Sequence, residues 1–500
     1  MRRIIGLPEV SSLYLIDEVS CTNTFVVPQS ALEGLKVPGS FRLAVKDNIA
    51  TGLLPTTCAS RILGGYTSPF EATIVAQMRA RNGVVVGTTN MDEFGMGSHS
   101  THSAYGPVVN GASTDGQPRS AGGSSGGSAV AVQIGDADIA LGTDTGGSVR
   151  LPAAYTGVIG YKPSYGMLSR YGVVPYANSL DTVGLLAPRV DEIYSLIFEQ
   201  GIYLEHDPND PTSLSVATRQ RCNEAYGIAP KTLADALPKN PKNFTIGIPM
   251  EYNVEELEPH IREIWTAAAD ALAAWGARVV PVYLPSTCHA LSAYYVIAPA
   301  EASSNLAKYD GVRYGRPNPE TGSTTDSTNT LYADTRGSGF GDEVRRRILL
   351  GAYSLSAEAI DNYFIQAQRV RRAVQRDFDR VFVRGNPLYE AAPFDLSEMG
   401  DEVVLDNKLG PPQVDFLLVP TAPTFAPRLD EVSTQSPMDT YANDVFTVPA
   451  SLAGLPAISI PVRVEGTSRE IAGLQIIAQF WDDARLLGMA KELTRIMGGV

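Results

Sequence analysis

The sequence predicts an α/β fold in which helices cover a central β-sheet. Segments with helical apolar spacing alternate along the chain with segments that read as buried strands, which is the pattern of a sheet flanked by helices. Residues 71–82 have helical spacing, and the valine-rich segment 84–87 that follows predicts a short strand. The amphipathic segment 262–275 and the strand-like residues 278–280 repeat this arrangement.

Three further elements flank the glycine-rich part of the chain. Residues 41–49 alternate in polarity like a strand and lead into a polar turn. Residues 129–134 predict a helix, and residues 138–141 predict another strand. Flexible linkers lack such flanking elements, so the glycine-rich segments are interpreted as functional loops.

The chain is predicted to form one large domain over residues 1–500. Its 500 residues would suffice for several average domains, but the sequence has no internal repeat and no linker that divides it. Three polar, turn-rich stretches with little periodicity are expected to be surface insertions. They are residues 206–243, 316–340 and 386–412.

Charge and composition exclude several classes of protein. The chain has 40 basic and 54 acidic residues, a net charge of −14, so we expect any RNA to be held mainly by a partner. No apolar run reaches the roughly 20 residues that span a bilayer. The basic start, residues 1–6, is too brief for a secretory signal and is at most a weak transit segment. The four cysteines lack pairing motifs and are expected to be free thiols.

Two glycine-rich segments, 122–128 and 142–150, carry the chemistry. Glycines at this density let backbone and substrate approach each other closely. A phosphate-binding loop would need a lysine after its glycines, and neither segment has one there. The dinucleotide-binding spacing G-x-G-x-x-G is also absent. The segments are therefore interpreted as parts of a functional site, and their serines are candidate nucleophiles.

A serine nucleophile needs a base that removes its proton. None of the five histidines lies in a motif that suggests a triad. His99 and His102 have a spacing that a metal site could use, but no acidic or cysteine ligands accompany them, so we expect surface-loop histidines and no metal. The remaining base is a lysine that desolvation makes neutral. Lys46, at the end of an apolar strand, is the candidate, although a strand-end lysine is by itself more often solvated.

With these motifs the chain resembles the amidase signature family over nearly its whole length. The family's lysine lies in a Val-Lys-Asp-Asn context, which matches Lys46. Its bridging serine is the first in Gly-Gly-Ser-Ser-Gly-Gly, which matches Ser124. Its nucleophile closes Asp-x-Gly-Gly-Ser, which matches Ser148. The resemblance implies a single domain with a twisted, mixed sheet, a Ser–cis-Ser–Lys triad and hydrolysis of an amide.

The resemblance also implies how the second glycine segment acts. The oxyanion that forms at the amide carbon would be met by the backbone N–H groups of Thr145, Gly146, Gly147 and Ser148. Arg150, two residues after the nucleophile, is expected to brace the loop.

Several further stretches resemble one subgroup of the family, the A subunits of glutamyl-tRNA(Gln) amidotransferases. These stretches are residues 89–94, 162–166, 301–306, 309–315, 345–348, 441–444 and 451–456. In that subgroup three side chains hold glutamine, and they fall here on Tyr294, Arg347 and Asp444. Arg347 could bind the α-carboxylate bidentately and Asp444 could pair with the α-ammonium, while Tyr294 offers a hydroxyl.

The resemblance to this subgroup implies partners. Ammonia would pass to a B subunit, which uses ATP and Mg²⁺ to amidate Glu-tRNA(Gln) and holds most of the tRNA, and some forms add a small third subunit. No cofactor is expected in this chain. This sequence has Asn110-Gly111 where family members often have Asn-Pro, and its segments 316–340 and 386–412 look longer than those of bacterial relatives. We therefore expect a mitochondrial protein of the matrix. A bacterial protein of this kind would be cytoplasmic. The alternative is a stand-alone amidase that acts on another small amide.

Overall fold

The core of the molecule is one large mixed β-sheet. The computed structural model describes residues 23–26, 29–111, 116–238, 240–316, 332–389, 413–463 and 471–498. Within these residues the sheet has 11 strands in the order β1-β3-β2-β4-β6-β5-β10-β11-β9-β7-β8. Its strands are β1 (Asn23–Val26), β2 (Phe41–Lys46), β3 (Gly83–Thr89), β4 (Ile139–Asp144), β5 (Ile159–Lys162), β6 (Thr182–Ala187), β7 (Thr245–Pro249), β8 (Arg278–Val282), β9 (Phe416–Pro420), β10 (Ala457–Arg463) and β11 (Ile471–Ala478). The expected mixed α/β fold is therefore confirmed.

Parallel and antiparallel pairs occupy different parts of the sheet. Strand β2 runs parallel to β3 and β4, and β7 runs parallel to β8 and β9. Between these groups, strands β4, β6, β5, β10, β11 and β9 pair antiparallel in succession. Every residue of β4, β5, β6 and β9 is buried, as expected for strands covered on both faces.

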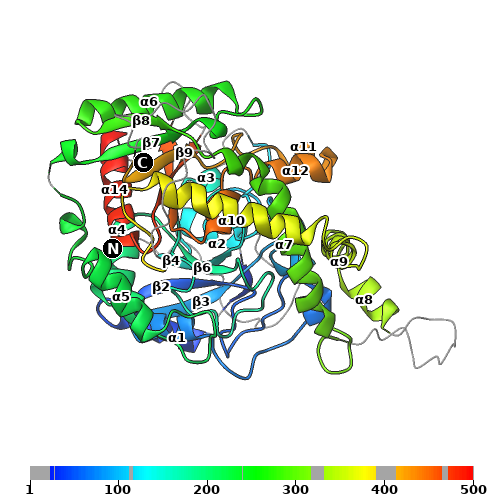
Figure 1. The fold of residues 1–500 in the computed structure, drawn as a ribbon. Helices are drawn as coiled ribbons and strands as arrows, with labels where there is room; N and C mark the ends of the chain where they lie inside the picture. The colour runs from blue at the N-terminus through cyan, green and yellow to red at the C-terminus, as the bar shows by residue number, and fades with distance from the viewer. Residues whose placement is uncertain are drawn as a thin grey trace.

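Helices surround this sheet, and α6, α10 and α14 are among the longest (Figure 1). The helices are α1 (Thr73–Arg79), α2 (Gly126–Gln133), α3 (Arg150–Thr156), α4 (Val190–Tyr194), α5 (Val216–Tyr226), α6 (Pro259–Trp275), α7 (Ala290–Asn305), α8 (Ala333–Gly339), α9 (Asp342–Ser354), α10 (Phe364–Val381), α11 (Leu429–Thr434), α12 (Pro437–Ala442), α13 (Val448–Ala453) and α14 (Asp483–Ile496). Among the described residues, none of the helices is both long and apolar enough to cross a membrane.

Strands β2 and β4 are central to function because they lie side by side and point the same way. Leu43 of β2 pairs with Ile139 of β4, and Val45 pairs with Leu141. These apolar side chains are buried in the main core, which fixes the register of both strands. Parallel strands end at the same edge of a sheet, so the loops after β2 and β4 meet there.

The three predicted insertions lie partly within the described residues. The 206–243 stretch contains helix α5 and buries Arg219 and Cys222, so it is more ordered than its composition suggests. Of residues 316–340, the part 333–339 forms α8, while 317–331 and most of 386–412 lie outside the described residues. Cys58, Cys222 and Cys288 are free thiols, as predicted, and Cys21 lies outside the described residues.

Candidate active site

The fold brings the predicted lysine and both glycine-rich segments to one edge of the sheet. Lys46 is the last residue of β2, and Asp144 ends the neighbouring strand β4. The first glycine segment leads directly into α2, which begins at Gly126. The second segment turns from β4 into α3. Ser124 lies in the first of these segments and Ser148 in the second.

The amine of Lys46 is enclosed by hydroxyl groups. Its Nζ lies 2.8 Å from Ser124 Oγ, 2.8 Å from Ser125 Oγ and 2.9 Å from Thr143 Oγ1. The side chain is fully buried, and this burial lowers the pKa of Lys46 to about 7, against the opposing effect of nearby aspartates. A substantial fraction of the amine is thus neutral near pH 7 and can accept a proton.

Ser124 is held in place by Asp92. The Gly123–Ser124 peptide bond is cis, as the resemblance implied. The backbone N–H of Asp92 donates to the carbonyl of Ser124 at 3.3 Å, and its carboxylate accepts from the N–H of Ser100 at 2.8 Å. A Cβ at Gly123 would lie 2.1 Å from Asp92 Oδ2, so only glycine fits beside this carboxylate.

Ser148 is the most accessible of the three triad residues. It follows Gly147, which has a φ of +149°. A Cβ added at Gly147 would lie 2.2 Å from Thr447, so both the backbone conformation and the available space require glycine. Its carbonyl accepts the N–H of Ser125 at 3.0 Å, which places it next to the first glycine segment. Ser148 keeps 9% exposure, whereas Ser124 keeps 1%. Ser148 is therefore closer to the surface than Ser124, which is buried beside Lys46.

The turn before Ser148 presents unused backbone donors. Within the part of the chain that the structure describes, the N–H groups of Gly146, Gly147 and Ser148 donate to no protein oxygen. Thr145 begins the turn, and its hydroxyl donates to Asp181 at 2.7 Å. Buried N–H groups normally find partners, so this turn is suited to an oxyanion.

A buried ion pair braces the same turn, as expected for Arg150. Arg150 and Asp144 are both fully buried, with Arg150 Nη2 2.8 Å from Asp144 Oδ1. Arg150 also donates to the carbonyl of Thr447 and to Gln475. Burial alone would raise the pKa of Asp144, but the guanidinium outweighs this and lowers it, so the carboxylate stays charged and the pair intact.

Tyr294 contacts the turn before Ser148, and Asp444 lies near it through Thr447, whose hydroxyl donates to the carbonyls of Gly146 and Asp444. Tyr294 on α7 packs on Gly146, where an added Cβ would lie 2.6 Å from its ring. Asp444, between α12 and α13, accepts hydrogen bonds from Ser98 at 3.0 Å and from the hydroxyl of Tyr295 at 2.8 Å. Burial raises the pKa of Asp444 to about 6, against the effect of these hydrogen bonds, so its carboxylate is mostly ionised at neutral pH.

Arg347 projects from the inner face of α9 into an aromatic box and is not a surface charge. Its Nε donates to Glu343 at 2.8 Å and its Nη1 to the hydroxyl of Tyr176 at 2.8 Å. The guanidinium also lies over the rings of Tyr295 and Tyr441. Among the described residues, Nη2 makes no hydrogen bond, so one edge of the cation remains available to an anion.

Comparison with known proteins identifies the family of the chain. The family model described as Amidase matches residues 41–487 of the chain. The chain belongs to the amidase family. This span includes Lys46, both glycine-rich segments and the three residues predicted to hold a substrate.

Curated relatives of this amidase cover nearly all of it. The mitochondrial A subunit of the glutamyl-tRNA(Gln) amidotransferase of Fusarium vanettenii is 65% identical over 454 residues, or 91% of this chain and 86% of the relative. The protein of the same name from Neurospora crassa is 59% identical, with coverage of 91% and 90%. The chain is also similar to the crystal structure of the glutamyl-tRNA(Gln) amidotransferase A subunit from Thermotoga maritima, with 34% sequence identity and a TM-score of 0.68. The match covers 94% of this chain and 90% of the Thermotoga maritima chain.

The prediction of two surface-loop histidines was wrong for His99. This side chain is buried, with Nδ1 2.9 Å from Ser120 Oγ and Nε2 3.2 Å from the amide of Asn443. Burial lowers the pKa of His99 to about 4, so the ring is neutral. His102 is exposed, as expected. No group of three potential metal ligands occurs in the described parts of this amidase.

Sequence reasoning missed the residues that support the amidase site. Ser125 and Thr143 contact Lys46, Asn48 contacts Thr143, and Tyr176 and Glu343 hold Arg347. Ser125 and Thr143 lie within or beside the glycine segments, and their polarity next to a buried amine could have indicated them. Tyr176 comes from an irregular loop, and no sequence pattern points to it.

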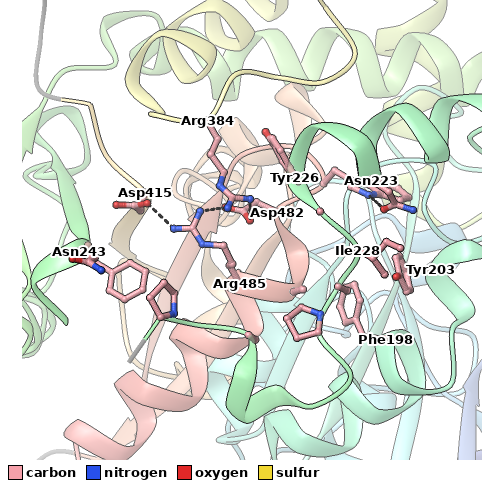
Figure 2. Close-up of a pocket in the computed structure, with 18 residues that line it drawn as sticks. Phe198, Tyr203, Asn223, Tyr226, Ile228, Asn243, Arg384, Asp415, Asp482 and Arg485 are labelled. Carbon is pink, nitrogen blue, oxygen red and sulfur yellow. Dashed lines mark hydrogen bonds and ion pairs between the residues drawn. The ribbon is translucent and has the colours of Figure 1, made fainter. Parts of the chain in front are cut away.

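A separate cavity of about 360 Å³ lies under the 226–238 segment and has no part in the amidase site (Figure 2). Figure 2 shows Arg485 between Asp415 and Asp482, with Arg384 beside Asp482. The ion pairs measure 2.6 Å, 3.0 Å and 3.1 Å, respectively. The charged side chains labelled at this cavity are thus paired with one another.

The Thr143→Val variant is expected to lower kcat/KM about fivefold. Valine keeps the shape of threonine but removes the hydroxyl that lies between Lys46 Nζ, at 2.9 Å, and Asn48 Nδ2, at 3.1 Å. The loss of one buried hydrogen bond corresponds to roughly 1 kcal/mol. Steady-state kinetics measure the effect. Thr88→Val is the matched control, because the buried hydroxyl of Thr88 has no partner among the described residues; an equal loss there would contradict the assignment.

Proposed function

We propose that the chain is the glutamine-hydrolysing A subunit of a mitochondrial glutamyl-tRNA(Gln) amidotransferase. The observation that carries this proposal is the pairing of a buried anion and a buried cation near the turn before Ser148. The hydroxyl of Thr447 donates to the carbonyls of Gly146 and Asp444, and the guanidinium of Arg347 lies over the ring of Tyr295, whose hydroxyl donates to Asp444. A plain amidase needs only the triad, whereas this site adds one cation and one anion. The names of the relatives that match most of the chain support the same function.

The triad hydrolyses the amide in two stages. Ser148 Oγ attacks the side-chain carboxamide carbon of glutamine, Ser124 takes its proton, and Ser124 passes its own proton to neutral Lys46. The oxyanion accepts N–H bonds from the turn at Gly146 and Gly147. The proton then returns through Ser124 to the amide nitrogen, the C–N bond breaks, and ammonia leaves an acyl ester on Ser148. Water, deprotonated by the same relay, cleaves the ester and releases glutamate.

Charge complementarity selects glutamine. Its α-carboxylate fits the free edge of the Arg347 guanidinium, since this group forms forked hydrogen bonds to carboxylates. Its α-ammonium fits the ionised carboxylate of Asp444, which Ser98 and Tyr295 hold in place. The hydroxyl of Tyr294, whose ring packs on Gly146, contributes a polar contact to the same end of the ligand.

The released ammonia passes to a partner subunit. In this proposal a B subunit, alone or with a small third subunit, binds ATP and Mg²⁺ and amidates Glu-tRNA(Gln). The glycine segments of this chain carry no lysine of a nucleotide-binding loop, and its net charge of −14 suits a subunit that leaves most tRNA contacts to a partner. The mitochondrial names of the relatives support a location in the mitochondrial matrix.

The Arg347→Ala variant separates this function from that of a stand-alone amidase. We expect the KM for glutamine to rise about 100-fold, because a desolvated charged contact is lost, while hydrolysis of a small neutral amide such as propionamide continues. The ammonia released from each substrate measures the two effects.

Two further variants serve as controls for this experiment. Arg347→Lys keeps the charge that pairs with Glu343 but loses the fork, so it should show an intermediate KM. Arg345→Ala removes an exposed arginine from the same helix, where it pairs with Asp342, and should leave KM unchanged. An unaltered glutamine KM in Arg347→Ala would favour the stand-alone amidase.

A further inference from the structure

Tyr295 of α7 contacts both charged residues of the proposed glutamine site. Its hydroxyl donates to Asp444 Oδ2 at 2.8 Å. The guanidinium of Arg347, on the neighbouring helix α9, lies over its ring, with Cζ 5.2 Å from the ring centroid. An aromatic ring attracts a cation that lies over its face. A single side chain therefore contacts both the cation and the anion that are proposed to bind glutamine.

Arg347 and Asp444 do not pair with each other, although both are buried. Within the described parts of the chain, the ion pair of Arg347 is with Glu343, at 2.8 Å. Opposite charges attract strongly in a buried site of low dielectric constant, and a direct pair would neutralise both charges. The separation that leaves them available to a ligand therefore has to be maintained by their neighbours.

The carboxylate of Asp444 is held by only one of its oxygens. The hydroxyls of Ser98, at 3.0 Å, and Tyr295 donate to the same atom, Oδ2. In the part of the chain that the structure describes, Oδ1 accepts no hydrogen bond. The same holds for Nη2 of Arg347, which donates to none of the described residues. Each charge thus keeps one free edge, as a ligand with both an ammonium and a carboxylate requires.

A second tyrosine fixes the orientation of the Tyr295 ring. Tyr441 stacks on it, with ring centroids 4.0 Å apart and an interplanar angle of 20°. The hydroxyl of Tyr441 donates to Glu343 Oε1 at 2.8 Å, and the same oxygen accepts Nε of Arg347 at 2.8 Å. These contacts form a closed ring of neighbours, so Tyr295 cannot turn without disturbing the residues that hold Arg347.

We propose that Tyr295 is the positioning residue that sets the separation of the two charges, and that it thereby makes the site specific for amides of α-amino acids. This inference rests on the proposed function, because it takes glutamine as the substrate. In an α-amino acid the ammonium and the carboxylate are bonded to one carbon, so both are bound only if the anion and the cation of the site are held at a matching separation. The hydroxyl of Tyr295 holds Asp444, and its ring holds Arg347.

The experiment measures the ammonia released from four amides by the full-length chain. They are glutamine, 4-aminobutanamide, which lacks the carboxylate, glutaramic acid, which lacks the ammonium, and butanamide, which lacks both. Tyr295→Phe removes the hydroxyl and keeps the ring, whereas Tyr295→Leu removes both. Each variant therefore tests one of the two contacts against a substrate that depends on it.

Tyr295→Phe should raise KM about tenfold for the two amides that carry an ammonium, because a hydrogen bond to a charged group is lost. It should leave KM for glutaramic acid and butanamide unchanged. Tyr295→Leu should also raise KM for glutaramic acid about tenfold, since the ring no longer supports the guanidinium. The kcat for glutamine should change less than about twofold in Tyr295→Phe, because the hydroxyl does not contact the triad.

Two further variants serve as controls. Tyr194→Phe removes a hydroxyl that donates to the carbonyl of Pro230 at 2.7 Å, on helix α4, which contributes no residue to the site. It should leave all four reactions unchanged. Ser98 donates to Asp444 alone among the described residues, so Ser98→Ala should affect only the amides that carry an ammonium.

The phenylalanine variant decides the test even if Tyr295→Leu does not fold. An equal loss with all four amides in Tyr295→Phe would show that the hydroxyl only stabilises the fold. An unchanged KM for glutamine would show that it does not position Asp444. Either result overturns the inference and leaves the proposed function standing. A wild-type chain that hydrolyses butanamide as well as it hydrolyses glutamine would instead refute the proposed function.

Discussion

The Ser148→Ala variant should lose glutamine hydrolysis by at least about ten-thousandfold while the assembled enzyme still uses free ammonia. Removal of a nucleophile disables the whole triad, because the relay has no hydroxyl left to deprotonate. In the proposed function the partner subunit needs only ammonia from this chain, and added ammonium salt supplies it. The measurement compares amidation of Glu-tRNA(Gln) with glutamine and with ammonium chloride as nitrogen donor.

Ser128→Ala is the matched control for this experiment. Ser128 belongs to the same glycine–serine run, is buried, and donates to the carbonyl of Leu141 at 3.0 Å, away from the proton relay. We expect it to retain most of its activity with either donor. Loss of the ammonia-dependent reaction in Ser148→Ala would contradict the role of Ser148 as nucleophile, as would retention of glutamine hydrolysis.

The Lys46→Met variant should reduce kcat for glutamine by about 100- to 10,000-fold. Methionine is also unbranched and fills the buried space, but it cannot accept a proton, and general-base catalysis is typically worth about this much. The hydroxyls of Ser124, Ser125 and Thr143 stay in place around the missing amine, so the nucleophile itself is intact. Single-turnover measurement of the first ammonia release reports the acylation step directly.

Lys162→Met is the matched control for this variant. Lys162 is a second fully buried lysine, and burial lowers its pKa to about 7 as well. Its Nζ donates to the carbonyl of Pro163 at 3.2 Å and has no contact with the triad. A change in thermal stability with little change in kcat is expected. If the two methionine variants lost activity equally, a specific role for Lys46 as base would be untenable.

Local patterns predicted the parts of the fold that have one exposed face or a clear boundary. The predicted helix 262–275 corresponds to α6, and the predicted strands 84–87 and 278–280 correspond to β3 and β8. Strands such as β6, with the sequence TVGLLA, were missed because burial on both faces removes the alternation of polar and apolar residues. The order of the strands depends on contacts between distant segments, which no local pattern encodes.

The residues proposed as catalytic could be named from the sequence because their motifs are contiguous. Lys46 ends a strand, and both serines lie in glycine-rich loops. The structure brings these segments together. The residues that hold these side chains in place could not be predicted in the same way. Glu343 lies in a helix and Tyr176 in an irregular loop, and 171 residues separate Tyr176 from Arg347. A buried histidine such as His99 has no sequence spacing that distinguishes it from an exposed one.

The central claim is that an uncharged Lys46 drives acylation through Ser124. The most direct test is the pH dependence of kcat at saturating glutamine. Burial lowers the pKa of Lys46 to about 7, and only the neutral amine accepts a proton, so kcat should rise with pH and reach half its maximum near pH 7. In kcat/KM a further loss should occur below about pH 6, as Asp444 is protonated and binds the ammonium less well. A kcat that stays constant from about pH 5.5 to 8.5, across the range in which such a base titrates, would contradict the account.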